Sequence, residues 1–215
     1  MKLLAIERSR ATALFRITRP SGQPYLPDFF ANVSRRYGFD GAPRSVGELG
    51  GNKAEFRHGL FEGNAIESLE IYNDGFIVTS NSDTDFVDQF VDDLVTWLKD
   101  DQGFSVIETH TVCKMYDSTL LVETRCNVFK PFEVYSEISR MIETGLQEST
   151  GLKVAFENYG FALSADQTRN PALKPVFFRV ERKEGIEFSR NQLFSTAPLK
   201  TRQHLEVLKR LEQLA

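Results

Sequence analysis

The fold is decided by residues 54–98, which read AEFRHGLFEGNAIESLEIYNDGFIVTSNSDTDFVDQFVDDLVTWL. Two dipeptides typical of two-residue hairpin turns, Gly63-Asn64 and Asp74-Gly75, divide the first part of this stretch into three runs. Such turns require positive φ angles, which glycine and asparagine tolerate. The runs are rich in β-branched and aromatic residues. The stretch therefore predicts a three-stranded antiparallel meander followed by a helix.

The predicted turns also give the register of the meander. With each dipeptide at a turn centre, Phe56 faces Ile71 and Ile71 faces Val78. Side chains alternate between the two faces of a strand. One face is therefore expected to collect these side chains: Phe56, His58, Leu60, Leu69, Ile71, Phe76 and Val78. On that face His58 is predicted to be a buried, hydrogen-bonded structural histidine rather than a catalytic base.

The end of the stretch has the periodicity of an amphipathic helix. Apolar residues recur at helical spacing, at Phe86, Val87, Phe90, Val91, Leu94, Val95 and Leu98. Ser82 or Asp83 can cap its start by accepting a backbone N–H, and Gly103 is placed to end it. An apolar helix face that follows an apolar sheet face predicts that the two cover each other.

The remaining chain continues this pattern of hairpins and helices. A second hairpin is expected around Asp117-Ser118, and a third around Glu184-Gly185. The other expected elements are a strand over 2–19, helices over 28–37, 131–150 and from Thr201 onward, and a strand over 153–163. The helix over 131–150 has an apolar stripe made by Ile138, Met141, Ile142 and Leu146.

This order predicts an α+β protein with a mainly antiparallel sheet built from hairpins. About four helices are expected to lie largely on one face of that sheet. The chain is interpreted as a single domain over residues 1–215, with a possible two-part substructure split near residue 103.

Composition limits the location of the protein. There is no run of about 18 apolar residues that could cross a membrane, and the charged residues Glu7 and Arg8 leave no room for a secretory signal near the N-terminus. Two cysteines, Cys113 and Cys126, are too few for a disulfide framework and are expected to be reduced thiols. A cytoplasmic location follows.

The charges are segregated along the chain. Residues 1–60 contain ten Lys or Arg against five Asp or Glu, whereas residues 61–101 contain one Lys against eleven acids. Parity places three of the bases on one face of the first strand, and periodicity places three of the acids on one face of the helix: Arg8, Arg10 and Arg16, and Asp85, Asp88 and Asp92. A pI of about 5.5 argues against binding of nucleic acid.

No residue pattern assigns a catalytic group, a metal site or a cofactor. The three histidines are far apart in sequence, and none has the spacing of a zinc ligand. The glycine-rich residues 47–54 lack the spacing of a phosphate loop, and Ser195-Thr196 has the composition of a turn. For the acidic row of Asp85, Asp88 and Asp92 three interpretations stay open: a solvated face, a protein-binding ridge or a divalent-metal site.

Two hypotheses follow. The first is a non-enzymatic protein that acts through protein–protein contact or self-association, with the acidic row and the arginine stripe as the binding residues. The alternative is a hydrolase that uses carboxylates with His58 or with a divalent metal, and its site is expected near the loop over 39–52.

Overall fold

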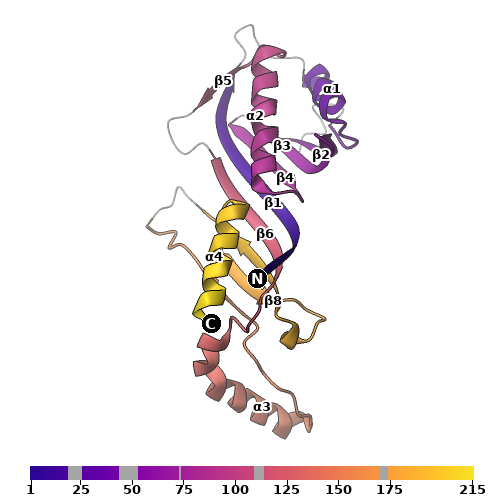
Figure 1. Ribbon diagram of the computed structural model, residues 1–215. Helices are drawn as coiled ribbons and strands as arrows, with labels where there is room; N and C mark the ends of the chain where they lie inside the picture. Colours follow the sequence, from indigo (N-terminus) through magenta and orange to yellow (C-terminus); the bar gives the residue numbers. More distant parts are fainter. Residues whose placement is uncertain (19–25, 44–52, 73, 109–113, 170–173) are drawn as a thin grey trace. The chain divides into compact units, whose positions relative to one another are not determined.

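The computed structural model describes residues 1–18, 26–43, 53–72, 74–108, 114–169 and 174–215 (Figure 1). The chain divides into two compact units. Unit 1 contains Met1–Ala5, Leu120–Ala197 and Arg202–Ala215, and unit 2 contains Ile6–Thr119 and Pro198–Thr201. Strands β1 and β6 each contribute residues to both units, and residue 103 lies within unit 2.

The α+β class with a mainly antiparallel sheet is confirmed. The α-helices of the described residues are α1 (Leu26–Tyr37), α2 (Thr84–Asp100), α3 (Ser136–Thr150) and α4 (Thr201–Leu214). Two short 3₁₀ segments are η2 (Lys130–Tyr135) and η3 (Phe188–Arg190). The strands are β1 (Lys2–Thr18), β2 (Lys53–Phe61), β3 (Asn64–Tyr72), β4 (Gly75–Ser80), β5 (Ser105–Glu108), β6 (Lys114–Glu123), β7 (Gly160–Leu163), β8 (Phe178–Arg182) and β9 (Gln192–Ala197).

In unit 2 the strands lie in the order β2-β3-β4-β1-β6, and β5 pairs with β1. The meander β2–β4 is present, but its register differs from the predicted one by two residues: Phe56 pairs with Leu69, and Leu69 with Val78. The first turn is centred one residue earlier, on Glu62 (φ 47°) and Gly63 (φ 79°), which supply the two positive φ angles of a tight hairpin. A shift of two keeps the alternation, so the predicted core face is correct for most of its residues.

The prediction that His58 is buried is wrong. Its backbone adopts φ 54°, in the left-handed region, and its side chain is 71% exposed. The conformation of this residue shifts the alternation of buried and exposed side chains along β2 by one position. Gly59 is therefore buried in place of His58, and the side chain of Leu60 is exposed. A Cβ atom on Gly59 would lie 2.4 Å from Cε1 of Phe39, so only glycine leaves room for that ring.

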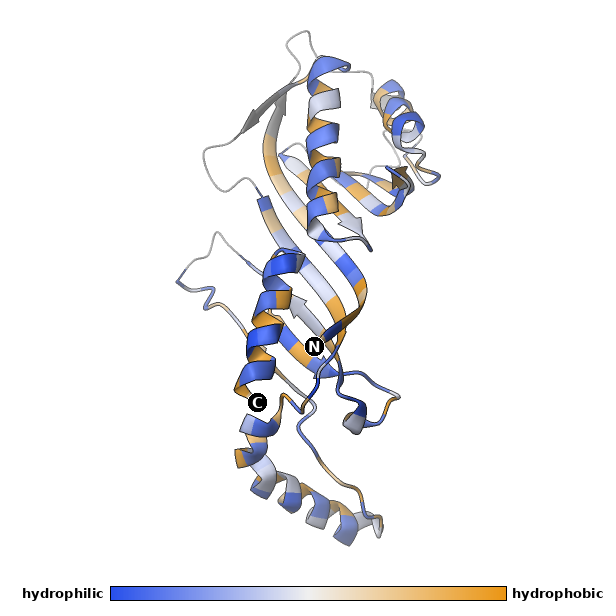
Figure 2. Ribbon diagram, in the orientation of Figure 1, coloured by the Kyte–Doolittle hydropathy of each residue, from blue (hydrophilic) through white to orange (hydrophobic). Residues whose placement is uncertain are grey.

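An aromatic core holds α1 and α2 against one face of the meander. The Tyr37 ring lies 4.8 Å from the ring of Phe90, and the Phe30 ring lies 5.9 Å from that of Phe56. The Tyr37 hydroxyl donates a 2.7 Å hydrogen bond to Asp93. Burial, reinforced by this hydrogen bond, raises the pKa of Tyr37. Along β1 the residues of one parity, Ser9, Ala11, Ala13 and Phe15, are buried. Figure 2 shows the hydropathy of each residue along these elements.

The first residues of α2 and α4 bond to each other. The backbone N–H of Thr84 donates to Oγ1 of Thr201 (3.1 Å), and the N–H of Thr201 donates to Oγ1 of Thr84 (2.8 Å). Both residues are buried. As predicted, Asp83 caps α2 by accepting from the N–H of Phe86 at 2.8 Å. Each threonine thus satisfies a backbone donor that a helix start leaves without a partner.

Unit 1 contains the order β6-β9-β8-β7, and α4 buries Leu208 and His204. The predicted hairpin around Asp117-Ser118 is wrong, because β6 runs straight through both residues. The predicted third hairpin is also shifted: β8 pairs with β9, for example Val180 with Ser195, and residues 188–190 form a 3₁₀ turn. Ser195 therefore lies in a strand and not in a turn.

We expect Phe90→Ala to lower the free energy of unfolding by about 3–5 kcal/mol, because it deletes a fully buried ring. Urea unfolding followed by far-ultraviolet circular dichroism measures this change. Lys99→Ala is the control on the same helix, since Lys99 is exposed and its replacement is expected to change stability by less than about 0.5 kcal/mol. Equal unfolding curves for Phe90→Ala and the parent would contradict the packing of α2.

Candidate functional site

Helix α3 turns its polar side toward its own unit and leaves its apolar side exposed. None of its residues is buried. Ile138, Met141 and Ile142 are 54%, 69% and 42% exposed. Gly151, in the left-handed conformation (φ 72°), ends the helix. Three of the four residues predicted for the apolar stripe are thus exposed, and among the described residues no element covers them, whereas the fourth, Leu146, is half-buried.

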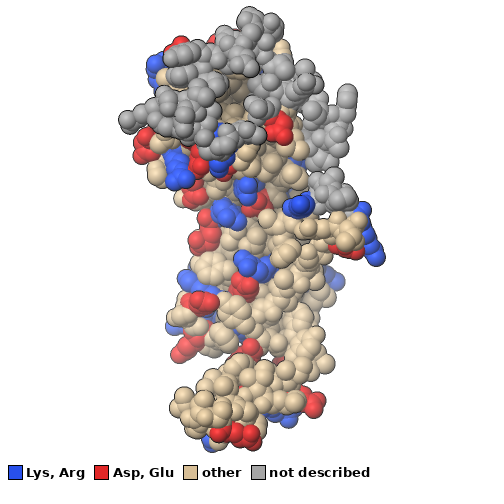
Figure 3. Space-filling model, turned by 180° about the vertical axis from the view of Figure 1, so that it is seen from behind, with Lys and Arg blue, Asp and Glu red and all other residues tan. Residues whose placement is uncertain are grey.

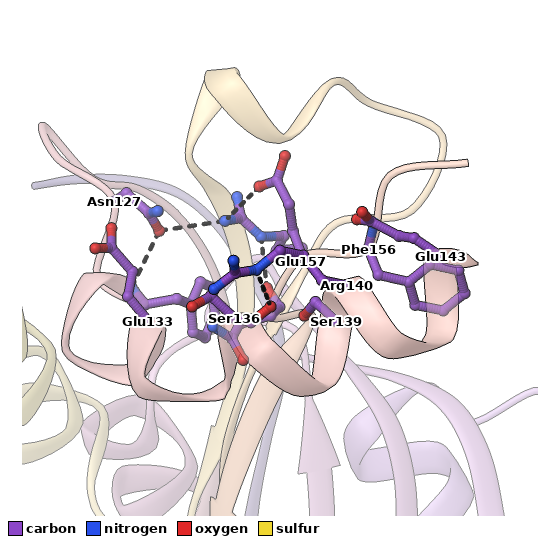
Figure 4. A pocket seen from close by; sticks show the side chains of 11 residues that line it. Asn127, Glu133, Ser136, Ser139, Arg140, Glu143, Phe156 and Glu157 are labelled. Carbon is purple, nitrogen blue, oxygen red and sulfur yellow. Dashed lines mark hydrogen bonds and ion pairs between the residues drawn. The ribbon is translucent and has the colours of Figure 1, made fainter. Parts of the chain in front are cut away.

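Glu143 ties the polar side of α3 to the segment that follows the helix. Its Oε1 accepts a 2.7 Å hydrogen bond from the backbone N–H of Phe156. Ser136, Ser139 and Glu143 line a hollow of about 370 Å³ in unit 1 (Figure 4). These residues lie on the opposite side of the helix from the apolar stripe, since they are spaced by three and four positions along one row.

Arg182 also lines this hollow and is 3% exposed. Its guanidinium group lies between the rings of Phe129 (5.0 Å) and Phe188 (4.4 Å). It donates to the backbone oxygens of Asn158 (2.9 Å) and Phe188 (3.0 Å) and to Oδ1 of Asn127 (3.2 Å). Burial lowers the pKa of Arg182. These contacts make Arg182 a structural link between three segments of unit 1, which leaves it few donors for a ligand.

Exposed apolar side chains are concentrated around α3. Of the fifteen large hydrophobic residues that are exposed in the described part of the chain, eleven lie between positions 134 and 177. They are Val134, Tyr135, Ile138, Met141, Ile142, Leu152, Val154, Phe156, Tyr159, Leu163 and Phe177. In Figure 3 the part of unit 1 that carries α3 is mostly uncharged, with charged groups at its margin. Apolar side chains gathered in this way are typical of an interaction surface.

The acidic row predicted on α2 has partners within unit 2. Asp88 accepts hydrogen bonds from Nζ of Lys114 (3.1 Å), from the hydroxyl of Tyr116 (2.7 Å) and from Nζ of Lys200. Asp92 accepts from Nζ of Lys114 at 2.9 Å. We call these five residues with Asp85, which lies 3.7 Å from Nζ of Lys200, the Asp88 cluster. The sequence did not predict that Lys114 and Lys200 contact this row, because both are far from α2 along the chain.

Electrostatics in the Asp88 cluster favour the charged forms of Asp88 and of the lysines that bond to it. Burial alone would raise the pKa of Asp88, but hydrogen bonds from Lys200, Tyr116 and Lys114 outweigh it and leave the pKa below its ordinary value. The hydrogen bond to Asp88 raises the pKa of Lys200. The side chain of Asp88 is only 16% exposed, whereas those of Asp85 and Asp92 are 65% and 71% exposed. Asp88 therefore has a structural role, and a role of this row in binding a partner stays a prediction.

The predicted arginine stripe does not meet the acidic row in the described part of unit 2. Arg8 and Arg10 alternate with buried residues of β1, so they lie on the sheet face away from α2. Nη2 of Arg8 lies 3.7 Å from Asp117, which is 8% exposed. Burial raises the pKa of Asp117. Arg16 pairs with Ile107 of β5. A role for these three arginines in binding a partner also stays a prediction.

Ser195 and His204 form a serine–histidine contact that sequence analysis did not predict. Oγ of Ser195 lies 2.8 Å from Nε2 of His204 and 2.9 Å from the backbone oxygen of Arg179. Only the hydroxyl can donate to that carbonyl, so the histidine donates to the serine, the reverse of nucleophile activation. The two residues are 1% and 0% exposed, and burial lowers the pKa of His204 to about 4. This is the geometry of a buried structural pair.

Near the predicted loop, Nδ1 of His58 lies 3.1 Å from Oδ1 of Asp40. Both side chains are 71% exposed, and residues 44–52 of the loop lie outside the described part of the chain, as does Cys113. Cys126 is a free thiol. Over the described residues no group of three or more His, Cys, Asp or Glu side chains is arranged to hold a metal ion. The hydrolase hypothesis stays a prediction with this one exposed pair near its expected site.

No protein-family pattern matches the chain, and no curated protein matches its sequence. Among the described helices, none is both long enough and apolar enough to cross a membrane.

Asp88→Asn is expected to lower the free energy of unfolding at pH 7 by about 1–3 kcal/mol, because it leaves partly buried donors without a charged acceptor. The folded-state pKa of Asp88 lies below its ordinary value. The parent's advantage is therefore present above pH 4, roughly the ordinary pKa of Asp, and is lost as the pH falls through the folded-state pKa. Urea unfolding of both proteins between pH 7 and pH 2.5 tests this. Asp92→Asn, at an exposed position, is the control and should cost less than about 1 kcal/mol.

A second prediction concerns α3 itself. The triple variant Ile138→Gln/Met141→Gln/Ile142→Gln should change the free energy of unfolding by less than about 1 kcal/mol, because these side chains bury little surface and glutamine favours helix. Thermal unfolding followed by circular dichroism measures it. A loss of several kcal/mol, comparable to that expected for Phe90→Ala, would mean that the stripe is covered within the chain.

Proposed function

We propose that this protein works by binding another protein and has no catalytic activity of its own. The single observation that supports this proposal is the exposed apolar side of α3 together with the exposed apolar residues that follow it. A helix in water normally directs such a stripe toward a core. Leaving it exposed forfeits a favourable burial that a partner surface can supply.

The arrangement of α3 also supports binding rather than packing within the chain. Glu143 fixes the polar side of the helix to the backbone of residue 156, so the apolar side is held outward. A helix that is fixed before it meets its partner loses less conformational entropy on binding. We also place the protein in the cytoplasm, since the free thiol of Cys126 suits a reducing compartment.

Site-specific photo-crosslinking in the native organism tests the proposal. p-Benzoylphenylalanine at position 138, on the exposed side of α3, is expected to give a crosslinked species after irradiation. The same group at position 207 of α4 is the control, because Val207 is also exposed (39%) but lies on another helix. The absence of any product at position 138, or equal products at both positions, would contradict a partner-binding role for α3.

A further inference from the structure

We infer that the partner segment that docks on α3 is a basic amphipathic helix. This inference rests on the proposed function and names the chemistry of the partner. The exposed stripe places Ile138, Met141, Ile142 and Gly145 at positions i, i+3, i+4 and i+7. That spacing forms one straight seam on a helix, the pattern that a second helix recognises with its own seam.

Gly145 makes a notch in this seam. A Cβ atom built there would meet no atom within 4 Å. Beside it lies a shallow hollow of about 390 Å³, lined by Glu137, Arg140, Met141, Thr144, Gly145 and Glu148. A glycine inside an exposed helix costs about 1 kcal/mol relative to alanine. The open space that it leaves fits a large aliphatic side chain or the stem of a lysine from the partner.

The rim of the hollow is acidic. Glu137 and Glu148 border it on one side of the helix, eleven positions apart, which is about 16 Å along the axis. Neither carboxylate makes an ion pair within the described residues, whereas all three carboxylates of the Asp88 cluster are paired. Arg140 also lines the hollow, and its Nε–H donates to the backbone oxygen of Ser136, so the rim carries two carboxylates against one guanidinium group. A cationic partner would satisfy both carboxylates at once.

Charge also argues against the other occupants. Helix α3 carries three glutamates and one arginine. Glu143 lies on the other side of the helix, so two copies in contact along the stripe would bring the four carboxylates of Glu137 and Glu148 together with two guanidinium groups, and like charges across an interface oppose association. An anionic membrane surface would be repelled for the same reason. A helix of about three turns, apolar along one seam and with Lys or Arg near both ends, matches both the seam and its rim.

The experiment measures binding of designed peptides to the full chain. The probe is a fluorescein-labelled helical peptide of about 18 residues, with leucines along one seam and lysines beside it. Its matched control has glutamate at every lysine position. Fluorescence anisotropy is expected to give a Kd for the basic peptide at least about tenfold lower than for the acidic one at low salt, and the difference should shrink as salt rises.

Two double variants locate the effect on the protein. Glu137→Gln/Glu148→Gln should weaken binding of the basic peptide by about fivefold, as expected for the loss of two exposed ion pairs. Glu67→Gln/Glu206→Gln removes the same charge from exposed sites elsewhere and should leave the Kd within about twofold of the parent. Circular dichroism melting curves that match the parent show that each variant is folded.

Three results would overturn the inference. They are equal affinity for the basic and acidic peptides, no effect of Glu137→Gln/Glu148→Gln, or a dimer in sedimentation velocity that the triple glutamine variant of α3 abolishes. The last result would identify a second copy as the occupant. If crosslinking at position 138 still captures a partner in any of these cases, the binding function stands and only the partner chemistry is wrong.

Discussion

Burial of α2 against the meander is the constraint on which unit 2 depends. Its inner side fills the aromatic core through Phe90 and its neighbours, its start is bonded to Thr201, and its outer side carries Asp88. One helix thereby meets a sheet, a second helix start and two lysines. The apolar contact supplies most of the free energy, since exposed ion pairs contribute little, while the polar contacts fix the position of the helix on the sheet.

Helices α2 and α3 show that one sequence pattern has two structural outcomes. Both have an apolar row at helical spacing. In α2 the row includes Phe90 and Leu94, which are fully buried, whereas in α3 it includes Met141, which is 69% exposed. The difference lies outside the helices: a meander with a complementary face precedes α2, and a hydrogen bond from Phe156 to Glu143 holds the polar side of α3. An amphipathic period therefore does not by itself determine whether the apolar side of a helix is buried within the chain, because that depends on the surrounding elements.

The sequence could predict features that depend on alternation, because alternation survives a register error of two residues. Phe56, Leu69 and Val78 therefore share a buried face as expected. It could not predict the positive φ of His58, since that conformation is rare for residues other than glycine. The hairpin predicted around Asp117 was wrong for a related reason: the dipeptide Asp-Ser is compatible with a turn but does not require one.

Only part of the candidate site could be predicted from the sequence. The stripe on α3 is visible as a period, but its exposure depends on the absence of a cover among the described residues, which no local pattern encodes. The partners of Asp88 come from β6 and from Lys200, far away along the chain. Contacts of that kind depend on topology, and hairpin turns alone do not determine it.

The bond between Thr84 and Thr201 has a consequence for synthesis on the ribosome. Unit 2 contains residues 6–119 together with 198–201, so its last four residues are translated long after the rest. At 5–20 residues per second the nascent chain waits roughly 4–16 s between Thr119 and Thr201. During that interval the start of α2 has no threonine to receive its N–H group, and Asp88 has only the partners supplied by β6. Neither unit is one continuous stretch of the gene, and so a simple truncation isolates neither of them.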